Sequence, residues 1–306
     1  MVHDTHPRQR LQAILLLLCA VAILPLIDAI AKHLSRDMSL WQITWARFTF
    51  HVLWLMPPFL LRHRVRELLP AHPGLQVLRG LCLTAATFLF FAGVAYMPIA
   101  DTLALSFISP LTVTLLSPFL LGEKVGVRRL SAVAVGLIGA LVIIRPGLGV
   151  FQPAALFGIG SGLVYANYVI ITRRLAGKVP ALVTLVYTAL LGLIITSAIV
   201  PFFWLPPTPE QWGFMVALGA IAALGHYLLI LAYERGEASM LSPFSYAEMI
   251  GACIVGYLAF GDFPDRWTWA GIAILVASGV YISIREHRVS PRPVAAAKEP
   301  EEITAG

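Results

Sequence analysis

Five ionisable side chains lie inside long apolar stretches of this 306-residue sequence: Asp28, Arg47, Arg79, Asp101 and Glu248. Removing a charge from water is costly unless a partner of opposite charge or several hydrogen bonds compensate. A charged side chain in such surroundings therefore binds a charged ligand, carries a proton, or pairs with another residue of the chain. These five residues are the first candidates for a functional site.

Glu248 lies deepest in its apolar stretch, which covers residues 238–260. A helix rises 1.5 Å per residue, so the carboxyl group is about 15 Å from the start of that stretch. Pro243 interrupts the helix just before it, and an interrupted helix frees backbone carbonyls that can line a binding site. We expect Glu248 and the neighbouring Tyr246 to contact substrate, with Glu248 holding an ammonium group or a proton. The alternatives are a structural ion pair and a protonated, hydrogen-bonded core acid.

Arg47 and His51 are four residues apart in the stretch 40–61 and therefore share one face of a helix. A guanidinium group binds carboxylates and phosphates through two parallel hydrogen bonds. We expect both residues to contact substrate, with Arg47 as the anchor for an anionic group. Two alternatives stay open for Arg47: a salt bridge to Asp28, which lies at a similar depth, and an extended conformation that reaches water at the helix end.

Arg79 and Asp101 lie nearer the ends of their stretches. Arg79 is about five residues inside the stretch 74–96, so its long side chain can reach water. Asp101 is close to the start of the stretch 98–121, where an acidic residue stabilises the first helical turn. Arg79 and Asp101 have two other possible roles, which Asp28 and Glu248 share. One is an ion pair with another residue, and the other is coupling to a transported proton.

His226, Tyr165 and Asn167 add polar groups to two further apolar stretches. A single buried His is more often a hydrogen-bonded core residue than a ligand, but facing a binding site it can stack on substrate or accept a proton. Tyr165 shares a helix face with Tyr168, and the Asn167 amide is costly in lipid. We include His226, Tyr165 and Asn167 as candidate substrate contacts, with structural roles as the alternative.

Composition identifies the elements that must position these side chains. Hydrophobic residues make up 58% of the sequence and charged residues 12%, about half the charged share of a soluble domain. A bilayer core about 30 Å thick is crossed by about 20 apolar residues in a helix. The predicted fold is an all-α integral membrane protein with ten transmembrane helices, at roughly 11–31, 40–61, 74–96, 98–121, 129–145, 153–172, 181–204, 211–233, 238–260 and 267–285.

Lys and Arg are distributed unevenly between alternate connections. One set of connections, together with both termini, holds 16 of the 22 Lys and Arg residues, and the opposite set holds 4. Because cytoplasmic loops carry the excess of Lys and Arg, both termini are predicted to be cytoplasmic. The net charge of +6 is spread over these short connections, which argues against a nucleic-acid partner.

The two halves of the chain are similar. Leu120-Leu121-Gly122-Glu123 precedes one Gly-containing stretch, and Ala259-Phe260-Gly261-Asp262 precedes another 139 residues later. Five spans per half is an odd number, so the second half must have the opposite orientation in the membrane. Inverted repeats are typical of secondary transporters and meet at the substrate site. The predicted divisions are an N-terminus (1–10), a first repeat (11–145), a second repeat (153–285) and a disordered cytoplasmic tail (286–306).

The sequence resembles the EamA family of the drug/metabolite transporter superfamily. The motifs that carry the resemblance are Ser109-Pro110 with Leu121-Gly122-Glu123, and Met249 with Gly261-Asp262. Asp262 stands where Glu is usual and Met249 where Pro is common. Asp28-Ala29-Ile30-Ala31-Lys32 and Trp45-Ala46-Arg47-Phe48 resemble a bacterial subgroup associated with S-adenosylmethionine uptake, riboflavin uptake and export of amino-acid-derived metabolites. The resemblance implies a ten-helix carrier of the cell inner membrane.

Residues and resemblance together predict a secondary transporter of a small polar metabolite, with export of an amino-acid-derived, carboxylate-bearing compound (an opine, a metallophore or an amino acid) preferred. The alternative is uptake of riboflavin or S-adenosylmethionine, and a distant one is an intramembrane enzyme. The sequence has no HExxH pair, no GxSxG motif and no P-loop, which argues against a metalloprotease, a serine hydrolase and an ATP-driven pump. We expect no cofactor and no metal; the partners are substrate and lipid, with a homodimer as one arrangement.

Overall fold

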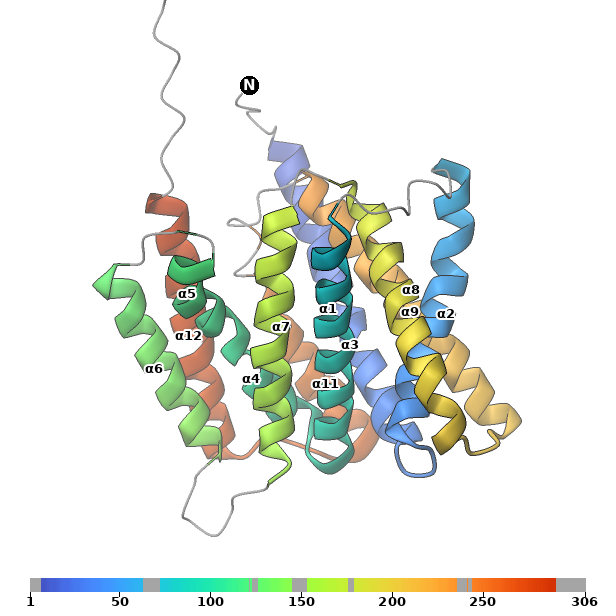
Figure 1. The fold of residues 1–306 in the computed structure, drawn as a ribbon. Coiled ribbons are helices and arrows are strands. Elements are labelled where there is room, and N and C mark those ends of the chain that lie inside the picture. The colour runs from blue at the N-terminus through green and yellow to red at the C-terminus, as the bar shows by residue number, and fades with distance from the viewer. Residues whose placement is uncertain are drawn as a thin grey trace, which may run out of the picture.

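The computed structural model describes residues 7–62, 72–120, 122, 126–144, 153–175, 179–235, 241 and 244–289, and in this part of the chain every regular element is a helix. The helices stand side by side, and neighbouring ones such as α6 and α12 run in opposite directions (Figure 1). They are α1 (Pro7–Leu34), α2 (Leu40–Arg62), α3 (Pro73–Tyr96), α4 (Ile99–Ser106), α5 (Ile108–Leu120), α6 (Val127–Ile144), α7 (Ala155–Leu175), α8 (Ala181–Ile199) with the short 3-10 helix η2 (Val200–Phe203), α9 (Pro209–Arg235), α11 (Glu248–Phe260) and α12 (Arg266–Val289).

Two ends of the bundle serve as reference points. The upper end in Figure 1 holds the first residues of α1 and the last residues of α12, and the lower end holds the connections 35–39, 97–98 and 261–265. Six of the seven tryptophans belong to segments at the lower end: Trp41, Trp45, Trp204, Trp212, Trp267 and Trp269. Tryptophans gather where a membrane protein meets the lipid headgroups, so this belt is typical of a membrane boundary.

Six helical segments are long and apolar enough to cross a membrane, and two shorter apolar helices accompany them. The six are 11–34, 73–96, 99–120, 155–172, 182–203 and 209–232, and the shorter two are 130–144 and 248–260. The sequence-based expectation of ten complete spans is therefore met in part by length and composition. Large apolar side chains on the outside of the bundle, such as Leu61, Phe119 and Leu258, fit a surface that faces lipid.

The expected span 98–121 is not one continuous helix. It is interrupted at Phe107, between α4 and α5. Pro110 explains the break, because proline has no backbone N–H to donate to Ser106 and its ring clashes with that carbonyl. The expected span 238–260 is interrupted as well, by a turn at Tyr246 and Ala247 before α11 begins. Pro243, to which the sequence attributes that interruption, lies outside the described residues.

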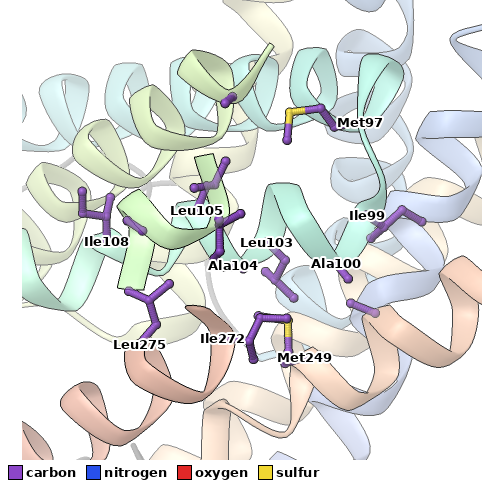
Figure 2. Packing of buried hydrophobic residues seen from close by; sticks show 14 of the residues in the cluster. Met97, Ile99, Ala100, Leu103, Ala104, Leu105, Ile108, Met249, Ile272 and Leu275 are labelled. Atoms are coloured by element: carbon purple, nitrogen blue, oxygen red, sulfur yellow. The ribbon is translucent and has the colours of Figure 1, made fainter. Parts of the chain in front are cut away.

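Glycines let α7 pack closely on the interrupted span. A Cβ atom at Gly158 would press on Leu105 and on the carbonyl of Thr102, and one at Gly162 would meet the carbonyl of Ser106 and the side chain of Ile108. The small-residue pattern of this stretch thus serves close helix packing. The same region forms the largest buried apolar cluster, which Figure 2 shows between α4 and residues of α11 and α12, such as Met249 and Leu275.

α6 and α12 pack against each other in opposite directions. Ser278 donates a hydrogen bond to the carbonyl of Ala132, and Gly271 packs closely against the carbonyl of Gly139. Equivalent positions of the two repeats are 139 residues apart, as Gly122 and Gly261 are. By this offset Ala132 is equivalent to Gly271, and Ser278 is equivalent to Gly139. The two contacts are therefore equivalent, so the last helices of the two repeats meet in a symmetric seam.

The repeated Gly-acid segments form matching turns. Gly122 has φ of 70° and Gly261 has φ of 72°, a left-handed backbone that glycine adopts without strain. Glu123 lies outside the described residues. Asp265, not Asp262, caps the following helix: it accepts the backbone N–H groups of Trp267 and Thr268, at 3.1 and 2.8 Å, at the start of α12.

Candidate functional site

Charged and titratable side chains from four helices come together in one cluster, called the central cluster below. Asp28 comes from α1, Arg47 and His51 from α2, His226 from α9 and Glu248 from the first turn of α11. Asp28, Arg47 and His51 are buried, at 8%, 6% and 3% exposure. The structure thus brings together five candidates from four helices that are far apart in the sequence.

Electrostatic contacts link the members of this central cluster. Asp28 lies within electrostatic reach of both Arg47 and Glu248, so it faces one cation and one further carboxyl group. Arg47 also lies within reach of His51 and His226. Acidic groups from α1 and α11 therefore face basic groups from α2 and α9 across the bundle interior.

The two histidines lie next to each other, with ring centroids 5.4 Å apart and planes tilted by 40°. His226 places Nδ1 2.8 Å from the carbonyl oxygen of Ala222, one turn earlier in α9. Because a carbonyl oxygen only accepts, Nδ1 carries the proton and donates this bond. The bond fixes the ring orientation and leaves Nε2 directed away from that carbonyl.

Three buried nitrogen atoms in this cluster have no hydrogen-bond partner among the described residues. They are Nη1 of Arg47 and both ring nitrogens of His51. The salt bridge considered between Arg47 and Asp28 is not present in the described part of the chain, although the two attract each other electrostatically. Buried polar atoms are almost always hydrogen-bonded in folded proteins, so unsatisfied atoms at one place point to a function.

α7 adds aromatic side chains beside Arg47. Tyr165 and Tyr168 stack with ring centroids 5.3 Å apart, and both lie within electrostatic reach of the guanidinium group. Asn167 makes a different contact: its amide donates to the carbonyl of Leu163 in its own helix, at 3.0 Å. That bond engages the Asn167 nitrogen within α7.

Arg79 does not extend to water, contrary to the sequence-based interpretation. It is 4% exposed and donates from Nε to Thr172 at 2.7 Å and from Nη2 to the Tyr168 hydroxyl at 2.9 Å. A weaker bond from Nη1 reaches the carbonyl of Thr184 at 3.4 Å. These bonds join α3 to α7 and α8, so Arg79 is a structural tie between these helices.

Tyr246 lies at the break before α11, and Asp101 lies in the first turn of α4. The Tyr246 ring packs edge-on against Phe107, with centroids 5.1 Å apart. Asp101, near the start of α4, lies within electrostatic reach of the Cys253 thiol on α11. Both therefore contact the α4–α11 region rather than the α2–α9 face.

One ion pair was missed by the sequence analysis. Lys32, near the end of α1, lies 2.6 Å from Asp262, which follows α11. The only signal was that Lys32 is one of few basic residues on its side of the predicted membrane, and nothing local pairs it with a residue 230 positions away. Among the described residues there is also no group of three His, Cys, Asp or Glu side chains that could hold a metal ion.

Comparison with known proteins agrees with this architecture. The chain is 26% identical to an S-adenosylmethionine uptake transporter of Rickettsia felis over 87% of its length and 90% of that protein. It is 29% identical to a riboflavin transporter of Vibrio cholerae, covering 94% and 97% of the two chains. It is 23% identical to the pseudopaline exporter CntI of Pseudomonas aeruginosa, covering 88% and 95%. A solved crystal structure shares the fold, with a TM-score of 0.65 and 22% identity over 91% of this chain and 99% of its own.

The sequence matches one family twice, over residues 11–145 and again over residues 152–284. The two matches cover most of the chain and correspond to the two similar halves. Together with the apolar helices, they identify a multi-pass membrane transporter and not an enzyme. The chain belongs to the EamA-like transporter family.

Proposed function

We propose that this transporter carries a zwitterionic, amino-acid-derived small molecule, bound by the central cluster between Asp28, Arg47, His51, His226 and Glu248. The observation that carries the proposal is the set of buried, unsatisfied nitrogens on Arg47 and His51 opposite two carboxyl groups. A substrate with a carboxylate and an ammonium group would satisfy both sides at once. Arg47 would bind the carboxylate in bidentate fashion, and Asp28 and Glu248 would hold the cation.

S-adenosylmethionine is the first candidate substrate. It carries an α-carboxylate, an α-ammonium group, a sulfonium cation and an adenine ring. The charged groups match the cluster, and the stacked Tyr165 and Tyr168 offer an aromatic face to the ring. Similarity to S-adenosylmethionine uptake transporters supports this substrate and uptake as its direction. Riboflavin matches the aromatic side chains but, being neutral, would offer no opposite charge to Arg47 or to either carboxyl group.

The second candidate function is export of an amino-acid-derived, carboxylate-bearing metabolite, the direction expected from the sequence. Similarity to a pseudopaline exporter supports it. The same anchor, Arg47, would bind the carboxylate in either direction, because a secondary carrier exposes one site alternately to the two sides.

We propose that the chain crosses the cell inner membrane ten times as two inverted repeats, with the upper end cytoplasmic. The bias of Lys and Arg towards the connections at that end supports this orientation. The start of α1 and the end of α12 lie at the same end of the bundle, which fits an even number of crossings (Figure 1). The opposite directions of α6 and α12 support the inversion of the second repeat.

The test is transport of radiolabelled substrate into and out of proteoliposomes that contain the purified protein. We expect S-adenosylmethionine to accumulate more than riboflavin, and excess methionine-like zwitterions to compete. Arg47→Ala and Glu248→Gln should weaken binding by tenfold or more, which corresponds to a loss of about 1.4 kcal/mol or more. Arg235→Ala is the matched control, because Arg235 is exposed and, among the described residues, its guanidinium donates to the Leu231 carbonyl of its own helix.

Preloaded vesicles and vesicles with external substrate distinguish export from uptake. Riboflavin transport that Arg47→Ala leaves unchanged would contradict the zwitterion proposal. A labelled amino-acid-derived compound that moves only outward would replace uptake by the second candidate.

A further inference from the structure

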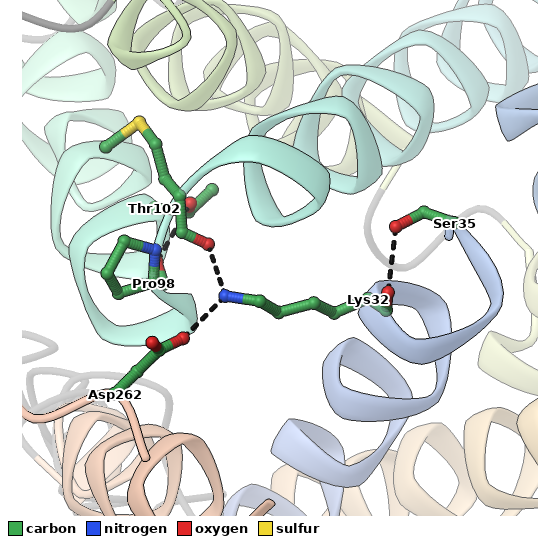
Figure 3. Close-up of polar contacts among 6 residues, drawn as sticks. Lys32, Ser35, Pro98, Thr102 and Asp262 are labelled. Carbon is green, nitrogen blue, oxygen red and sulfur yellow. Dashed lines mark hydrogen bonds and ion pairs between the residues drawn. The ribbon is translucent and has the colours of Figure 1, made fainter. Parts of the chain in front are cut away.

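Lys32 makes two strong contacts at the lower end of the bundle. Its Nζ donates to Oδ2 of Asp262 at 2.6 Å and to the backbone carbonyl of Met97 at 2.8 Å, as Figure 3 shows. These contacts join α1, the connection between α3 and α4, and the connection between α11 and α12. Residues of both repeats are therefore tied together by one ammonium group. We call Lys32, the Met97 carbonyl and Asp262 the lower gate.

The local backbone presents Asp262 for this contact. The left-handed turn at Gly261 ends α11, with the N–H of Gly261 bonded to Tyr257 and the N–H of Asp262 bonded to Gly256. Because Asp265 caps α12, the Asp262 carboxylate is not needed for that helix start. Asp262 thus remains available for an ion pair with the other repeat.

The surroundings strengthen this ion pair. The Lys32 and Asp262 side chains are 15% and 28% exposed, so water only partly screens their attraction. The Lys32 ammonium group also lies 5.1 Å from the centre of the Phe260 ring, and the Arg36 guanidinium lies 5.7 Å from the same ring. Among the described residues this is the only salt bridge.

Two rigid helices connect the lower gate to the central cluster. On α1, Asp28 precedes Lys32 by four residues and therefore lies on the same helix face. On α11, Glu248 opens the helix and Asp262 follows its end, and the helix between them is about 18 Å long at 1.5 Å per residue. α1 and α11 also pack against each other. Parting Lys32 from Asp262 therefore moves the same two helices that hold Asp28 and Glu248.

We infer that the Lys32–Asp262 ion pair is the gate that closes the lower end of this transporter, and that it breaks each time the central cluster opens to that side. A substrate cation held between Asp28 and Glu248 draws α1 and α11 together and so favours the closed gate. The inference rests on the proposed transport function in one respect: the flux measurement needs a transported substrate. Closure itself is measured without substrate.

Closure is measured by the rate at which a charged maleimide labels a cysteine just inside the gate. Ala29→Cys is the reporter, since Ala29 lies on α1 above Lys32 and packs against the buried cluster of α4 and α11. The full chain is used with Cys19, Cys82 and Cys253 replaced by serine. Asp262→Ala should raise the labelling rate by about tenfold, the change that ~1.4 kcal/mol of lost closed-state stability produces.

Arg36→Ala is the matched control. It removes a cation from the same helix end and from the same aromatic ring but leaves the ion pair intact. Labelling in that variant should stay at the parent rate. A double variant with Lys32→Asp and Asp262→Lys exchanges the two charges and should return the labelling rate towards that of the parent. Such a recovery would also show that the chain remains folded. Unchanged labelling in Asp262→Ala, or an equal increase in Arg36→Ala, would overturn the gate.

A second measurement connects the gate to transport. Lys32→Cys and Asp262→Cys joined by a short bis-maleimide should stop net flux while substrate still binds from the upper end. Continued flux through the cross-linked protein would also overturn the inference. If the wild-type protein binds no zwitterion, the proposed substrate is wrong, but the labelling rates still decide the gate.

Discussion

Phe107 and Tyr246 lie 139 residues apart in the sequence, and their rings meet edge to face with centroids 5.1 Å apart. That separation equals the offset between Gly122 and Gly261, so the two aromatics are equivalent positions of the two repeats. Each stands at the break of an interrupted span. A residue touches its own equivalent only close to the symmetry axis. The axis that relates the repeats therefore passes between the two breaks.

This contact predicts an energetic coupling between the breaks. Phe107→Ala and Tyr246→Ala should each lower thermal stability in detergent, and the double variant should lose about 0.5–1.5 kcal/mol less than the sum of the two. Thermal unfolding of the wild type, the two single variants and the double variant measures this coupling. Tyr246→Phe is the control, because it keeps the ring and should stay close to wild type. Additive losses would show that the rings touch without stabilising each other.

Arg47 and Arg79 are buried to a similar extent, but their removal should have different effects. Loss of Arg79 should mainly lower stability, and loss of Arg47 should mainly lower substrate binding. Arg79→Leu should cost about 2–4 kcal/mol, because it leaves Thr172, Tyr168 and the Thr184 carbonyl without their donor. Arg47→Leu should cost less than Arg79→Leu, since Nη1 of Arg47 has no hydrogen bond to lose and what is lost is the attraction between Arg47 and Asp28. It should nevertheless abolish substrate binding.

Unfolding temperature and ligand binding, measured on the same preparations, separate these two roles. Equal destabilisation by both substitutions would place Arg47 among the structural residues. Stable protein with normal binding after Arg79→Leu would show that the three bonds of Arg79 contribute little.

Packing of α7 on the interrupted span gives a third prediction. Gly162→Ala would place a methyl group against the Ser106 carbonyl and Ile108, and overpacking of this kind costs about 1–3 kcal/mol. Gly160→Ala, two residues earlier in the same helix, has Leu89 at an ordinary 3.5 Å and should be tolerated. Size-exclusion profiles after graded heating compare the variants. The prediction fails if both alanines are equally stable.

The two aspartates between α11 and α12 should have separable effects. Asp265→Ala removes two backbone hydrogen bonds and should cost about 0.5–2 kcal/mol as a lost helix cap. Asp262→Asn keeps the shape of the side chain and should change the labelling of the gate reporter more than the unfolding temperature. A reversed pattern, with Asp265→Ala opening the gate, would contradict the assignment of the two residues.

The sequence was sufficient for features with a local cause. Apolar runs predict where most helices lie, and the spacing of Gly122 and Gly261 predicts the two repeats, because glycine is required at a left-handed turn. The break at Phe107 also has a local signal in Pro110, although apolar length alone suggested an unbroken span. Local rules of this kind need no knowledge of neighbouring helices.

Features that depend on helix neighbours could not be predicted in the same way. Arg79 appeared close enough to the helix end to reach water, but α7 and α8 cover it and supply its acceptors. Lys32 and Asp262 pair only because α1 and α11 lie together. Arg47 and Glu248 were chosen for the cost of a charge in apolar surroundings, and the structure places both within reach of Asp28. Their contacts with substrate stay a prediction.

The seam between α6 and α12 has a consequence for the history of the chain. A half-length protein of this design would pair with a second copy and make one and the same seam contact at two symmetric places, so any substitution there would change both places together. Joining the halves in one polypeptide removes that constraint. Gly139 and Ser278 now occupy equivalent positions with different side chains, and only the serine donates a hydrogen bond across the seam. Each half can thus acquire changes suited to its own side of the membrane without imposing them on the other.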